Sequence, residues 1–218
     1  MNKVINTTQL SGISLLVGLI TTFVALGRWG IRPPYKKSQI SPKNQAFGIW
    51  TPIFLLVIFK SLNSILNENS NEKVISLLLL TFSFLCSALW VYFASTGKRY
   101  EFAALSITLG AFMAFFSHYF EEKPADLTTW VSQAAGAMTA SWLLLASTIS
   151  WDFVFEVNFP AVIAPILILT ISTVSIYTEK PLYMIPLIWA SFFLKTYSFI
   201  SILASLSLGT ISFYNSFI

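Results

Sequence analysis

The sequence predicts an all-α protein, a bundle of transmembrane helices that crosses the membrane seven or eight times. Three observations indicate this class: 56% of the 218 residues are hydrophobic, only 10% are charged, and the mean hydropathy is +0.73. A soluble domain usually carries about 25% charged residues. This chain has too few charges to cover a water-facing surface, so we expect an integral, multi-pass membrane protein whose exterior faces lipid.

The same composition excludes several functions. An ordinary soluble enzyme is excluded, and so is a nucleic-acid-binding domain, because the basic residues behind the net charge of +4 are scattered among apolar runs as topology signals. The single cysteine, Cys86, excludes an internal disulfide or a cysteine metal site. The sequence shows no phosphate loop, paired-carboxylate site or nucleophile–histidine arrangement. We therefore expect no catalytic residues and no metal site.

Long apolar runs define the predicted spans. A run of about 20 residues crosses the hydrocarbon core, and a spanning segment that satisfies its own backbone hydrogen bonds is a helix. The first six predicted helices are Leu10–Trp29, Ala46–Leu66, Val74–Thr96, Tyr100–Phe120, Leu127–Ser150 and Phe159–Tyr177. Lys195 divides the last segment, Pro181–Ile218, into two short helices, which gives eight spans and is the favoured interpretation. One long tilted helix, giving seven, is the alternative.

A few residues inside these runs need separate interpretation. Lys60, near a helix end, is expected to extend its ammonium group to the lipid headgroups. His118, the only histidine, is suited to bind a haem or chlorophyll metal but is expected to be interfacial and in contact with water. The acidic residues all fall at or near segment ends, which argues against a proton relay. Small residues in the fifth helix predict a close helix contact, within the bundle or in a dimer: Ala134, Ala135, Gly136, Ala137 and Ala140.

The most specific stretch runs from Ser41 to Phe54 and reads SPKNQAFGIWTPIF. It resembles the signature of the tryptophan-rich sensory protein family (TspO/translocator protein, MBR-like), in which a Trp-Thr pair opens the second helix. Ser87-Ala88-Leu89-Trp90 is similar to the Asn-x-x-Trp element of that family, with serine in place of asparagine. The resemblance implies a five-helix unit over residues 1–156. Residues 157–218 would add two or three helices, as in a longer branch of the family.

The resemblance also implies a ligand site for a planar, hydrophobic molecule, a tetrapyrrole such as a porphyrin or haem, or a sterol. Phe47, Trp50 and Phe54 are spaced by three and four residues, hence on one helix face, and aromatic walls suit such ligands. Gln133 stands where the second tryptophan of porphyrin-degrading members would be, so we do not expect that activity. The candidate ligand-binding residues are Phe47, Trp50, Phe54, Trp90, Gln133 and Trp142.

Three functions follow from these expectations. The first is binding of the hydrophobic small molecule for transport or sensing. The second is a non-catalytic accessory subunit of a larger membrane complex, or a homodimer. The third, a small-solute transporter, ranks last because the spans lack a polar lining.

Overall fold

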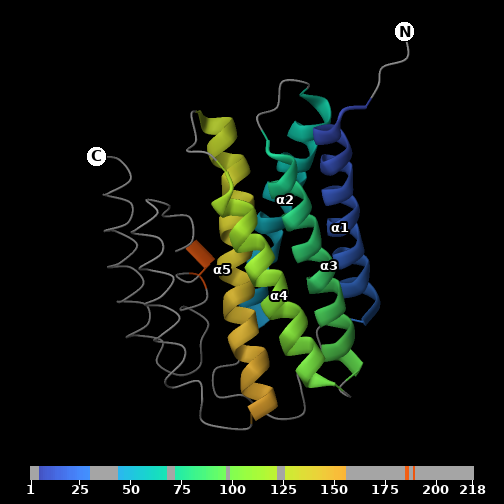
Figure 1. Ribbon diagram of the computed structural model, residues 1–218. Coiled ribbons are helices and arrows are strands. Elements are labelled where there is room, and N and C mark those ends of the chain that lie inside the picture. Colours follow the sequence, from blue (N-terminus) through green and yellow to red (C-terminus); the bar gives the residue numbers. More distant parts are fainter. Residues whose placement is uncertain are drawn as a thin grey trace.

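All secondary structure in the described part of the chain is helical. A computed structural model of the protein describes residues 5–29, 44–67, 72–96, 99–121, 126–155, 185, 186 and 189. These residues contain no strand, which confirms the predicted all-α class. The elements are α1 (Thr7–Trp29), the 3-10 helix η1 (Asn44–Ile49), α2 (Trp50–Leu66), α3 (Val74–Thr96), α4 (Tyr100–Tyr119) and α5 (Leu127–Phe155) (Figure 1).

Four of the described helical segments are long and apolar enough to cross a membrane: Thr7–Trp29, Phe47–Leu66, Val74–Thr96 and Tyr100–Tyr119. A helix of 23 residues rises about 35 Å, against a hydrocarbon core of about 30 Å. α5 is the longest of the described helices, with 29 residues, but is not among the four. The described residues therefore define a membrane protein and do not support a count of seven or eight spans. The helices predicted over Phe159–Tyr177 and Pro181–Ile218 lie outside the described residues, except for Ile185, Pro186 and Trp189.

The five helices close into a ring. α1 packs against α2 and α3, α3 packs against α4, and α5 completes the ring by packing against both α4 and α2. Consecutive helices run in opposite directions (Figure 1). We call the end at which α1, α3 and α5 begin the proximal end, and the end at which they finish the distal end.

The outer surface of the ring is apolar. α4 exposes large side chains at spacings of three and four residues: Phe102, Leu105, Leu109, Phe112, Phe116 and Tyr119. Its buried face carries mainly small residues, among them Ala103, Gly110 and Ala114. Continuous apolar stripes of this size are unfavourable in water, whereas lipid-exposed bundles place small residues between helices. The arrangement fits a protein whose outer solvent is hydrocarbon.

Glycines allow the helices to approach closely. A Cβ atom added at Gly12 of α1 would lie 2.9 Å from Ser64 Cβ of α2, and one added at Gly136 of α5 would lie 3.2 Å from His118 Cβ of α4. Gly18 and Gly110 make similar approaches between α1 and α3 and between α3 and α4. The close contact predicted for the fifth helix is thus made within the bundle.

Side-chain hydrogen bonds fix where two of the helices begin. The Gln9 backbone N–H donates to Asn6 Oδ1 at 2.8 Å, and the Asn6 N–H donates to Gln9 Oε1 at 3.0 Å. Asp126 and Thr129 make the same reciprocal pair at the start of α5. Such capping satisfies N–H groups that have no partner inside the helix.

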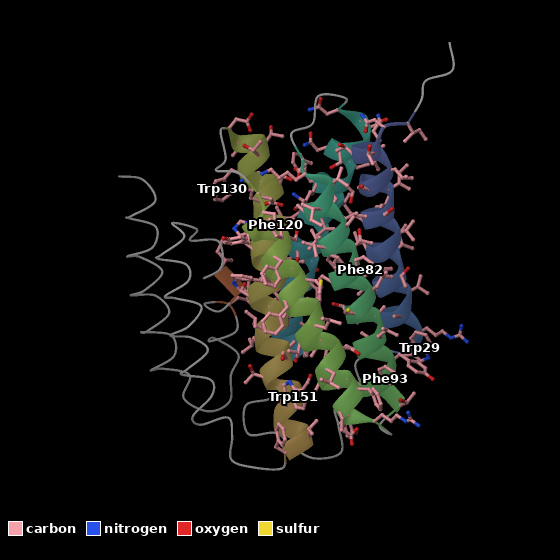
Figure 2. The ribbon with its side chains drawn as sticks, viewed as in Figure 1. Trp29, Phe82, Phe93, Phe120, Trp130 and Trp151 are labelled. Carbon is pink, nitrogen blue, oxygen red and sulfur yellow. The ribbon has the colours of Figure 1, made fainter. Side chains whose placement is uncertain are left out.

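Three tryptophans lie near the ends of the bundle. Trp130 lies toward the proximal end, and Trp29 and Trp151 lie toward the distal end (Figure 2). The Arg28 guanidinium lies 5.6 Å from the Trp29 ring centroid, so a cation accompanies an aromatic ring there. Tryptophan and arginine at helix ends are typical of the two membrane–water interfaces.

Candidate functional site

One face of α2 points into the protein and carries both an aromatic side chain and a charged side chain. Its buried residues include Trp50, Ile53, Val57 and Lys60. α2 and α5 run antiparallel, so that Trp50 contacts Trp142 while Lys60 contacts Ser132. Ten helical residues separate Trp50 from Lys60, which is about 15 Å along the axis. The protein therefore contains an aromatic site and, closer to the proximal end, an ionic site.

The aromatic cluster consists of Phe47, Trp50, Phe54, Phe84 and Trp142. The Trp142 ring lies 6.0 Å from Phe47 and 6.4 Å from Trp50, nearly perpendicular to both. Trp50 lies 5.2 Å from Phe54, whose ring is 6.2 Å from Phe84. Because Phe84 belongs to α3, which is not a ring neighbour of α2, the contact from Phe54 to Phe84 crosses the interior of the ring. Each such pair contributes about 0.5–1.5 kcal/mol beyond its buried area.

The two tryptophans at the centre of this cluster have unsatisfied donors. Trp50 is 6% exposed and Trp142 is 2% exposed. Within the described part of the chain, neither indole N–H has a hydrogen-bond partner. A buried donor without a partner costs about 1–3 kcal/mol. The cluster thus presents two N–H groups to any acceptor that enters it.

The structure brings together four of the six predicted ligand-binding residues: Phe47, Trp50, Phe54 and Trp142. Trp90 is buried, but its N–H donates to Ser150 Oγ at 3.1 Å, and Ser150 lies about 12 Å further along α5 than Trp142. Gln133 is also buried, and it follows Ser132 in the chain, about 13.5 Å along α5 from Trp142. Trp142 is the tryptophan of α5 that contacts Trp50.

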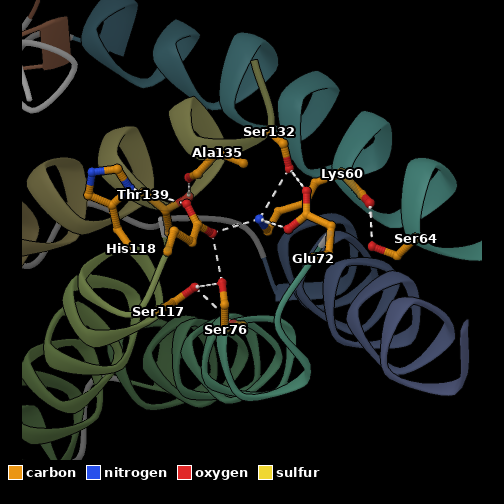
Figure 3. Close-up of polar contacts among 10 residues, drawn as sticks. Lys60, Ser64, Glu72, Ser76, Ser117, His118, Ser132, Ala135 and Thr139 are labelled. Atoms are coloured by element: carbon orange, nitrogen blue, oxygen red, sulfur yellow. Dashed lines mark hydrogen bonds and ion pairs between the residues drawn. The ribbon is translucent and has the colours of Figure 1, made fainter. Parts of the chain in front are cut away.

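The second site, the ionic cluster, is formed by Lys60, Glu72, Ser76, Ser117, His118, Glu121 and Ser132 (Figure 3). Lys60 Nζ lies 2.5 Å from Glu72 Oε2 and 2.6 Å from Glu121 Oε1. It also donates to Ser132 Oγ at 3.1 Å. Ser76 Oγ donates to Glu121 Oε1 at 2.7 Å, and Ser132 donates to Glu72 Oε1.

The burial of this cluster corrects two predictions. Lys60 is 0% exposed, so it does not reach the headgroups. It lies on the inward face of α2, and the carboxylates that neutralise it come from the residues just before α3 and just after α4. His118 is 1% exposed and is therefore not in contact with water. Its Nδ1 lies 3.4 Å from Glu121 Oε2, and its backbone packs against Gly136.

The ionic cluster fixes the protonation of Glu121, which lies beyond the end of α4. Burial by itself would raise the pKa of this carboxyl group. The charges and hydrogen bonds of Lys60 and His118 outweigh burial and lower the pKa from 4.5 to about 2. Glu121 is therefore an anion at every ordinary pH.

We predict an acid dependence of stability from this shift. A carboxyl group with a lowered folded-state pKa stabilises the fold above its unfolded-state pKa, and this stabilisation is lost as pH falls toward the folded-state value. The thermal midpoint in detergent should fall between pH 4.5 and pH 2, by an amount that corresponds to about 3 kcal/mol. Glu121→Gln should flatten this part of the profile. An unchanged profile in the variant would contradict the assignment.

Comparison with protein-family models, curated proteins and solved structures found no match for this chain. The class of protein is therefore defined by the fold and the two sites: a helical membrane protein whose described helices form a ring around an aromatic cluster and a buried ionic cluster. The resemblance to the tryptophan-rich sensory protein family stays a prediction.

Proposed function

We propose that this protein binds a planar, hydrophobic ligand inside the helix ring, at the aromatic cluster, for transport or sensing. The observation that carries the proposal is the pair of buried indole N–H groups of Trp50 and Trp142, which have no acceptor among the described residues. Aromatic rings around them offer stacking surfaces, and the two donors suit a ligand that carries acceptor atoms. A tetrapyrrole combines a flat ring system with carboxylate oxygens. A sterol, the alternative, offers one hydroxyl group and no flat π-face.

The sequence resemblance points to the same residues. The Trp-Thr pair of the SPKNQAFGIWTPIF stretch contains Trp50, and Phe47 and Phe54 flank it in the aromatic cluster. We infer a family relationship to the tryptophan-rich sensory proteins on this basis, with residues 1–156 as the shared unit. Gln133 at the position of the second tryptophan favours binding without degradation of the porphyrin.

Protoporphyrin titration tests the proposal. Protein purified in detergent should show saturable quenching of tryptophan fluorescence. Trp50→Phe keeps an aromatic ring and removes only the donor, so it should weaken binding by roughly 2- to 10-fold, the value of one ordinary hydrogen bond. Trp142→Phe should have a similar effect, and the double variant a larger one.

Trp90→Phe is the matched control. It makes the same substitution at a buried tryptophan whose N–H already donates to Ser150, so the dissociation constant should be unchanged. Quenching that does not saturate, or that is identical in all variants, would reject the aromatic cluster as the binding site.

A further inference from the structure

The ionic cluster connects segments that are far apart in the sequence. Glu72 precedes α3 and Glu121 follows α4, so Lys60 of α2 is bound to both connections at the proximal end. Ser132 adds α5 to the cluster. α1 is attached to the same end of α2 through the Gln9 side chain, whose Nε2 donates to Ile65 O at 3.0 Å. Polar contacts at the proximal end thus connect all five helices of the ring.

Each carboxylate oxygen of Glu72 and Glu121 has a polar partner in the cluster. Glu72 accepts hydrogen bonds from Lys60 and Ser132. One oxygen of Glu121 accepts from Lys60 and Ser76, and the other faces His118. Ser117 Oγ donates to the Ser76 carbonyl at 2.8 Å, which joins α3 to α4 beneath the carboxylates. Carboxylates that are 8% and 6% exposed leave little room for water.

Separating these groups is costly. Removing one partner of a buried ion pair is strongly destabilising, because the remaining charge stays buried without compensation. Acid does not release the cluster at ordinary pH, since Glu121 keeps its charge down to a pKa of about 2. A low pKa also makes Glu121 a poor proton carrier, because it binds a proton too weakly near neutral pH. The geometry therefore favours a permanent closure over a gate or a proton relay.

We propose that the ionic cluster seals the proximal end of the ring against water and solutes, so that ligands reach the aromatic cluster only from the distal end or from the lipid. The route of ligand entry rests on the proposed function. The closure of the proximal end by the ionic cluster does not depend on it. The protein is then a one-sided binding site and not a pore through the membrane. A sealed proximal end is compatible with ligand binding or sensing, but not with conduction of solutes through the ring.

Thiol accessibility tests the seal. Cys86 is the only cysteine, so Cys86→Ser gives a background in which Ala135→Cys is the sole thiol. Ala135 is 0% exposed and lies one helical turn beyond Ser132. A charged, water-soluble thiol reagent should modify this cysteine at least tenfold more slowly in the intact protein than in Lys60→Met. Thr96→Cys, at the exposed distal end of α3, should react equally fast in both and controls for reagent activity.

If Lys60→Met does not fold, Glu72→Gln is the second variant that weakens the ionic cluster. It keeps the size of the side chain and removes one charge. Equal reaction rates at Ala135→Cys with and without an intact cluster would overturn the seal. Protoporphyrin titration of the same samples keeps the two proposals apart. If quenching does not saturate while the cysteine at position 135 stays protected, ligand binding is rejected and the seal is still supported.

Discussion

Replacing Lys60 with methionine is expected to lower the free energy of unfolding by about 3–5 kcal/mol. Methionine has nearly the volume of lysine, so the substitution mainly removes charge. It leaves Glu72 and Glu121 buried and facing each other without the ammonium group that lies 2.5 Å and 2.6 Å from them. The thermal midpoint in detergent, followed by circular dichroism, should fall by roughly 10 °C or more.

Two controls separate this effect from a general loss of lysine. Lys73→Met makes the same substitution at an exposed position beside Glu72 and should change stability by no more than about 1 kcal/mol, the upper end for a solvent-exposed charge. The triple variant Lys60→Met, Glu72→Gln, Glu121→Gln removes all three charges and should recover part of the loss. A single Lys60→Met variant as stable as Lys73→Met would show that the ion pairs do not hold the proximal end together.

Gly12→Leu should be the second most damaging change. A single Cβ at Gly12 already lies 2.9 Å from Ser64 Cβ and 3.0 Å from the Ser61 carbonyl oxygen. A leucine side chain therefore forces α1 away from α2, and overpacking of this kind costs about 1–3 kcal/mol, or more where backbone must move. Loss of the Gln9 hydrogen bond to Ile65 should accompany the separation.

Gly27→Leu is the matched control, because a Cβ at Gly27 meets no atom within 4 Å. It lies in the same helix, so any general effect of leucine on α1 appears in both variants. Thermal midpoints that fall equally in Gly12→Leu and Gly27→Leu would contradict the close α1–α2 contact.

The helices could be predicted closely from the sequence because lipid imposes a simple rule on length and polarity. The predicted span Val74–Thr96 coincides with α3, and α4 ends one residue before the predicted Phe120. The largest difference lies at the end of the fifth helix, where α5 continues to Phe155, five residues beyond the predicted Ser150. At the start of the second helix, residues 44–49 form a 3-10 helix before α2 begins at Trp50. Pro52 then falls in the first turn of α2, where its missing N–H costs no helical hydrogen bond.

The aromatic cluster was partly predictable, and the ionic cluster was not. The spacing of Phe47, Trp50 and Phe54 places them on one face, but only the antiparallel packing of α2 and α5 brings Trp142 to that face. The partners of Lys60 come from Glu72 and from Glu121, which is 61 residues away in the chain. No local pattern links such distant residues. A lysine near a helix end is ordinarily assigned to the headgroups, and that general rule failed here.

Membrane extraction shows most directly whether hydrocarbon is the outer solvent of the helix ring. Membranes from cells that express the full chain should retain the protein through washes with high salt and with alkaline carbonate, and release it only into detergent. The exposed apolar stripes of α1, α3 and α4 predict this result. Folded, monodisperse protein in the detergent-free carbonate supernatant would contradict it.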